Sequence, residues 1–117
     1  AISSQEAQYH LNNIDGALNQ HVMKILAEDN LNVDYLNKNL VPVGYNQDPS
    51  KPSYFSNGNN KFRLHIENNH FGLKTVRYWN VNNELVYVHP MRNGRLATIY
   101  GKIDPQEAKS FLAYIDR

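Results

Sequence analysis

Two short turn signals constrain the fold of this chain more than any other feature, because they set strands side by side. Asn82-Asn83 and Asn93-Gly94 each separate two runs of alternating residues. Asn and Gly adopt the positive φ angles of two-residue hairpin turns at low cost. Folding the chain about both turns predicts that Tyr78 pairs with Tyr87 and that Tyr87 pairs with Tyr100. The register of three strands is thus predicted from local signals alone.

The strand-like runs predict a four-stranded antiparallel meander, with strands at about 61–67, 72–80, 84–91 and 95–101. A tight turn near 68–70 joins the first strand to the second. Side chains alternate across a strand, so the register also predicts two faces of different character. One is apolar and contains Trp79, Val86, Val88, Ala97 and Ile99, together with Phe62, Leu64 and Ile66 of the first strand. The other contains Tyr78, Tyr87, His89, Thr98 and Tyr100.

Helices are predicted on either side of this sheet in the sequence. Between residues 4 and 29, apolar side chains recur every three or four positions, at Ala7, Leu11, Ile14, Leu18, Val22 and Ile25. Residues 31–60 are rich in Pro, Gly and Asn and predict an irregular loop. Asp104 followed by Pro105 predicts the cap of a C-terminal helix over 104–116. The 117 residues are therefore predicted to be one α+β domain, a long N-terminal amphipathic helix packed on the meander with a short C-terminal helix.

The composition excludes several kinds of chemistry. The chain has no cysteine, which rules out disulfides, thiol catalysis and cysteine-bound zinc. Its five histidines form no HExxH motif and no i, i+4 pair, so their spacing does not predict a metal site. No serine stands in a GxSxG or SxxK context, and no phosphate-binding glycine loop is present. We therefore expect neither enzyme activity nor a cofactor, and no apolar run is long enough to span a membrane.

The polar face of the predicted sheet is the candidate binding surface. Tyrosine offers a large contact area with a polar tip, and basic residues outnumber acidic ones over 61–95. The residues predicted to bind a partner are Tyr78, Tyr87, Tyr100, Arg63, His65 and Lys74. Alternatively, the C-terminal helix or the 31–60 loop covers the tyrosines, or they stack on the bases of single-stranded nucleic acid. Between the two partner classes, the sequence favours protein over nucleic acid.

The predicted order of a long helix, an irregular loop and a four-stranded meander resembles the soluble head domain of type IV pilins and pseudopilins. The segment from Gly101 to Asp116, a short capped helix after the last strand, is also similar to the C-terminal region of some minor pilins. The resemblance implies a subunit of an extracellular fibre or secretion apparatus, which works by self-assembly or by contact with a protein partner. It implies an extracytoplasmic location, with membrane attachment only through a segment that would precede Ala1.

Three other functions fit parts of the sequence. One is a small inhibitor or immunity-type protein, whose tyrosine-rich face or 46–60 loop blocks an enzyme. The second is a nucleic-acid binder that uses Arg63, Lys74, Arg77, Arg92 and Arg95. The third is an enzyme on a cone-shaped α+β fold, with His89 and a tyrosine in a pocket.

Overall fold

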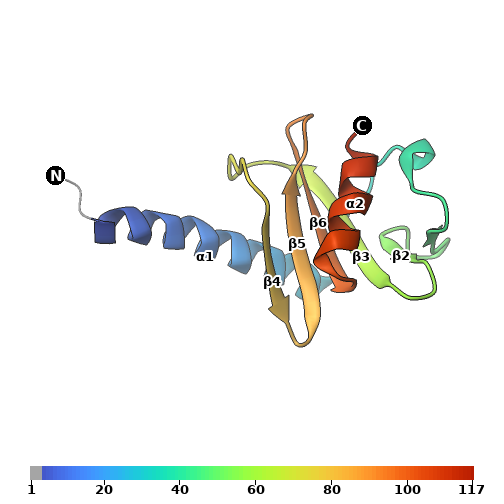
Figure 1. The fold of residues 1–117 in the computed structure, drawn as a ribbon, viewed down its shortest axis with the longest axis horizontal. Coiled ribbons are helices and arrows are strands. Elements are labelled where there is room, and N and C mark those ends of the chain that lie inside the picture. Colours follow the sequence, from blue (N-terminus) through green and yellow to red (C-terminus); the bar gives the residue numbers. More distant parts are fainter. Residues whose placement is uncertain (1–3) are drawn as a thin grey trace. The chain divides into compact units, whose positions relative to one another are not determined.

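The computed structural model describes the backbone of residues 4–117 and the side chains of residues 15–117. The chain divides into two compact units, residues 1–30 and residues 31–117. The elements are α1 (Ser4–Glu28), a 3-10 helix (Lys38–Leu40), β1 (Asn46–Gln47), β2 (Tyr54–Ser56), β3 (Lys61–Asn68), β4 (Arg77–Val81), β5 (Glu84–Pro90), β6 (Arg95–Lys102) and α2 (Pro105–Ile115) (Figure 1).

The first unit is the 25-residue helix α1. Its C-terminus is closed by Asp29 in a left-handed conformation, with φ of 51°. The N–H of Asn30 donates to the carbonyl of Ile25 at 3.2 Å, and that of Asp29 to Leu26 at 3.2 Å, the pattern of a Schellman cap. The predicted stripe positions Ala7, Leu11 and Ile14 lie outside the described side chains. In the described part of the chain, no helix combines the length and apolarity needed to cross a bilayer.

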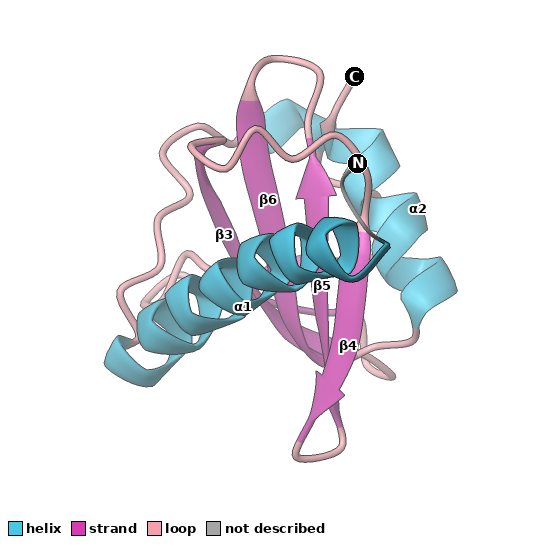
Figure 2. Ribbon diagram, turned by 90° about the vertical axis from the view of Figure 1, so that its left-hand side faces the viewer, coloured by secondary structure: helices cyan, strands magenta, loops and turns pink. Residues whose placement is uncertain are grey.

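The second unit is built on a six-stranded antiparallel sheet in the order β1-β2-β3-β6-β5-β4. Figure 2 shows the last four strands side by side. The α+β class with an antiparallel sheet is confirmed, but the predicted fold of a long helix packed on a four-stranded meander is wrong. β3 pairs with β6, so the chain crosses from β3 to the far edge before β4 begins, in Greek-key order.

The crossing begins where a hairpin turn was predicted, near 68–70. The side chain of Asn69 bonds the backbone of Leu73 twice, donating to its carbonyl at 2.8 Å and accepting from its N–H at 3.1 Å. These two bonds stabilise a loop after β3 in place of the predicted hairpin turn. Residues 72–76, predicted as the start of a strand, belong to the connection that precedes β4.

Residues 31–60, predicted as an irregular loop, contain the strands β1 and β2. Ser56 lies opposite Lys61, so four residues, 57–60, form the hairpin loop between β2 and β3. Asn57 accepts from the N–H groups of Asn59 and Asn60 at 3.2 and 2.8 Å, and Gly58 has φ of 93°. The run Tyr54-Phe55-Ser56 before a glycine-containing loop is the signal that predicts this hairpin. The neighbouring prolines obscured it.

The two turns that set the predicted register behave differently. Asn82 and Asn83 have φ of 52° and 64°, as in a type I′ turn, and Tyr78 lies opposite Tyr87 as predicted. The second turn contains three residues, 92–94, with φ of 79° at Gly94, so Tyr87 lies opposite Ile99 instead of Tyr100. A shift of one residue moves every side chain of β6 to the other face. Ala97 and Ile99 therefore join the face of Tyr87, and Tyr100 joins the face of Trp79.

α2 packs on the face of the sheet that carries Phe62, Tyr87 and Ile99. Its first turn is capped by Asp104, whose carboxylate accepts from the N–H groups of Gln106 and Glu107 at 2.8 and 3.0 Å. The centre of this core is aromatic. The Phe111 ring makes edge-to-face contacts at centroid distances of 4.9, 5.0 and 5.6 Å with Phe62, Tyr45 and Phe55.

Candidate functional site

A groove of about 790 Å³ lies at the β1 end of the sheet. Residues of β1, β2, β3 and β6 line it. It is lined by residues 46–49, 54–56, 61–63, Glu84 and 100–102. Phe62 points toward α2, so the alternation of β3 places Lys61 and Arg63 on the opposite face. The side chains that form the floor of the groove therefore belong to the sheet face opposite α2. The volume lies within the range of ordinary ligand pockets.

The floor is a row of three side chains on neighbouring strands. Tyr54 of β2 lies opposite Arg63 of β3, which lies opposite Tyr100 of β6. The Arg63 guanidinium carbon is 4.7 Å from the centroid of the Tyr100 ring and 5.9 Å from that of Tyr54. Cation–π attraction to two rings fixes the orientation of this cation. All three residues are half-buried.

A pair of lysines forms the next row of the groove. Lys61 lies directly opposite Lys102 in the β3–β6 register, and both are exposed. Among the described residues, no carboxylate lies within ion-pair distance of either ammonium group. Two acids also line the groove, Asp48 and Glu84. The Asp48 carboxylate accepts from the N–H groups of Ser50 at 2.8 Å and Lys51 at 3.3 Å, so it serves a turn.

The structure divides the predicted binding residues between different places. Arg63 and Tyr100 lie together in the groove. Tyr78 and Tyr87 lie on the α2 face, with rings stacked at 5.6 Å; Tyr78 is 59% exposed and Tyr87 is 3% exposed. Burial, and then the neighbouring Tyr78, raise the pKa of Tyr87. The predicted row from Tyr78 through Tyr87 to Tyr100 therefore does not form, because the three-residue turn at 92–94 puts Tyr100 on the other face.

His65 and Lys74 are also separated from the tyrosine pair. His65 is 7% exposed, and its Nδ1 accepts from the N–H of Asn32 at 2.9 Å while its Nε2 lies 3.3 Å from Glu67. It holds the chain after residue 30 to β3 and is not available at a surface. Lys74 is exposed in the connection before β4.

Of the five residues in the aromatic row and the lysine pair, sequence reasoning missed three, Tyr54, Lys61 and Lys102. Tyr54 was missed with strand β2. Lys61 was placed on a strand, but its cross-strand neighbour depends on the pairing of β3 with β6. Lys102 lies one residue beyond the predicted end of the last strand. Alternation along β6 from Tyr100 would have placed Lys102 on the same face.

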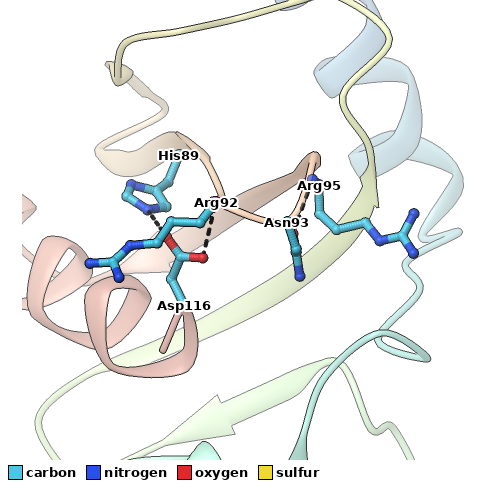
Figure 3. A network of polar contacts seen from close by, with 5 residues as sticks. All are labelled: His89, Arg92, Asn93, Arg95 and Asp116. Atoms are coloured by element: carbon cyan, nitrogen blue, oxygen red, sulfur yellow. Dashed lines mark hydrogen bonds and ion pairs between the residues drawn. The ribbon is translucent and has the colours of Figure 1, made fainter.

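A second polar cluster joins the end of α2 to the turn between β5 and β6 (Figure 3). The Asp116 carboxylate lies 3.3 Å from His89 Nε2 through one oxygen and accepts from the Arg92 N–H at 3.0 Å through the other. Within residues 15–117, His89 Nδ1 has no hydrogen-bond partner. These contacts connect two elements that are far apart in the sequence. We therefore call the cluster of His89, Arg92 and Asp116 a structural clasp. In the same part of the chain, no three His, Asp or Glu side chains are grouped as metal ligands.

The basic residues considered for nucleic-acid binding do not converge. Arg95 extends over the ring of Tyr35, 3.8 Å from its centroid, and donates to Asn68. Figure 3 shows its guanidinium pointing away from the Arg92 and Asp116 cluster. The Arg77 guanidinium donates to the hydroxyl of Thr75. Of the five cations, only Arg63 lines the groove.

Comparisons with protein-family models, with curated proteins and with solved structures found no significant match.

Proposed function

We propose that this domain acts without catalysis, by binding a segment of another polypeptide in the groove on the sheet face opposite α2. The observation that carries the proposal is the Tyr54–Arg63–Tyr100 row at the groove floor. Tyrosine and arginine are enriched in the energetically important centres of protein interfaces. The two rings hold the guanidinium in place before binding, so less side-chain freedom is lost when a partner docks.

The shape of the groove favours an extended segment. Its floor, the row of Tyr54, Arg63 and Tyr100, crosses the three strands β2, β3 and β6. Its outer side is β1, an edge strand of only two residues. A segment lying there would meet alternate side chains of β3 and β6 and the polar groups of 46–48. Docking of an extended segment in an aromatic-lined groove is a recurring mode of peptide recognition.

A displayed library of random twelve-residue peptides tests this proposal. We expect selection on the domain to enrich peptides whose NMR chemical-shift changes map to residues 54–56, 61–63 and 100–102. The double variant Arg63→Ala/Tyr100→Ala should lose that binding. A matched control is Lys109→Ala, an exposed position of α2 outside the groove. The proposal is overturned if no peptide is enriched, or if the enriched peptides bind the double variant as well as the original domain.

Assembly as a pilin-like subunit, in an extracytoplasmic compartment, stays a prediction. The meander on which that resemblance relied is replaced by a Greek-key sheet, so the strand order no longer favours it. The nucleotide sequence upstream of the codon for Ala1 tests it: a leader and an apolar stretch of about 20 residues would support a pilin. An inhibitor or immunity-type protein would also use the groove, and a tight complex with one enzyme encoded by a neighbouring gene would identify it.

A further inference from the structure

We infer that the segment recognised by the groove is acidic and that one of its carboxylates binds between Lys61 and Lys102. This inference rests on the proposed function and names the chemistry of the partner. Directly opposite residues on antiparallel strands have Cβ atoms about 5 Å apart, and like charges there destabilise the sheet. Lys61 and Lys102 are such a pair. An anion between them would turn their repulsion into two attractions.

The charges around the lysine pair also favour a carboxylate as the bound group. Arg63 follows Lys61 by two residues on the same face of β3, so three cations stand along one end of the groove. The two tyrosine rings orient Arg63. No carboxylate of the described residues forms an ion pair with Lys61 or Lys102. The lysine pair therefore brings to the groove two positive charges that no ion pair within the described residues neutralises.

Glu84 restricts where along the groove the carboxylates of the partner can bind. Glu84 lines the groove. The next residue, Leu85, lies opposite Gly101, so Glu84 stands beside Lys102. The two side chains do not form an ion pair. A second carboxylate of the partner would be repelled on this side. The acidic side chains of the segment are therefore expected to lie toward Arg63 and Tyr54, away from β5.

The probes are two fluorescein-labelled twelve-residue peptides that differ only in charge. One has Glu at every second position with Thr between, and the other has Gln in place of Glu. Fluorescence anisotropy should show the Glu peptide binding at least about tenfold more tightly than the Gln peptide, the change given by one well-placed charge contact. Its affinity should fall as salt is raised from about 50 to about 500 mM, because exposed charges are screened.

Three variants locate the effect. Lys102→Glu should weaken binding of the Glu peptide by about tenfold or more. Its urea midpoint should stay close to that of the original domain, since the new carboxylate gains an opposite charge at Lys61 and a like charge at Glu84. A merely structural Lys102 would instead lose stability and binding together. Glu84→Gln should strengthen binding, and Lys109→Glu on α2 should leave it unchanged, as a control of equal charge change.

The inference is overturned if the two peptides bind equally, if the Glu peptide does not bind, or if Lys102→Glu behaves like Lys109→Glu. These outcomes are distinct from failure of the proposed function. Neutral library peptides that bind the groove would uphold the function and overturn only the acidic specificity. A library with no groove-binding peptide would overturn both.

Discussion

Gly101 lies directly opposite Phe62 across the β3–β6 pair, and the two backbones approach so closely that no side chain fits between them. A Cβ on Gly101 would come within 2.3 Å of the Lys61 carbonyl oxygen and 2.5 Å of the Phe62 Cα. The residue also has φ of 156°. The Lys61 oxygen and the Phe62 Cα belong to the backbone, so no side-chain rotation can move them aside. Lys61 and Lys102 are the next pair in the same register, so the close approach brings both to the same end of the groove.

Gly101→Ala is therefore expected to destabilise the domain by about 2–4 kcal/mol, through steric overlap and backbone strain. Urea unfolding followed by circular dichroism measures the change. Gly58→Ala is the matched control, because Gly58 also has a positive φ, of 93°, but a Cβ there would meet nothing within 4 Å. Its cost should be only about 1 kcal/mol. Equal costs at the two glycines would contradict the overlap as the cause.

The type I′ turn at Asn82-Asn83 makes a second prediction. Asn83 has φ of 64°, a conformation that Gly adopts freely, Asn tolerates and Ala adopts only with strain. Asn83→Ala should lower stability by about 1 kcal/mol, whereas Asn83→Gly should be neutral or stabilising by a few tenths of a kcal/mol. Thermal unfolding of both variants checks the order. The turn assignment fails if Gly is the more damaging substitution.

The clasp between α2 and the β5–β6 turn is expected to contribute to stability as a unit. Asp116→Ala removes the acceptor of both His89 and the Arg92 N–H and should cost about 1–2 kcal/mol. The double-mutant cycle with His89→Ala should give a coupling energy of about 0.5–1.5 kcal/mol, as expected for residues in contact. Additive losses in urea unfolding would mean that the contact contributes nothing.

The stability of the domain is expected to depend on alkaline pH through ionisation of Tyr45. Burial, and then its hydrogen bond to the Glu107 carboxylate, raise the pKa of Tyr45 from 10.0 to about 12; that bond is 3.0 Å long. Because the folded-state pKa is above the unfolded one, the stabilisation is complete below about pH 10 and is lost as the pH rises toward about 12. The Tyr45→Phe variant cannot ionise at this position, so its urea midpoint should fall less steeply over the same pH range.

Other groups titrate in the same pH range, so the comparison is the difference in slope between the two proteins. Identical slopes would contradict the raised pKa. The Tyr45→Phe substitution keeps the ring that contacts Phe111 and Phe62, so the variant is expected to fold. At neutral pH it should show a constant offset in stability from the lost hydrogen bond to Glu107.

The sequence by itself determined the features that depend on a few neighbouring residues. Asn82 and Asn83 specify their turn because only a small set of residues adopts positive φ cheaply. Asp104 caps α2 because its carboxylate reaches N–H groups two and three residues ahead. The alternation of Phe62, Leu64 and Ile66 places these side chains on one face of β3. The pairing of Tyr78 with Tyr87 follows from the turn between them.

Only the tertiary structure decided which strands meet and which faces are shared. Local signals allow either a two-residue or a three-residue turn around Asn93-Gly94, and the choice of three moves Tyr100 from the side of Tyr87 to the side of Arg63. The partner of β3 lies far along the chain, and it is selected by burying Phe62 and Ile99 together beneath Phe111. The groove depends on that selection, because Tyr54, Arg63, Tyr100 and the Lys61–Lys102 pair come from strands that no short-range signal joins.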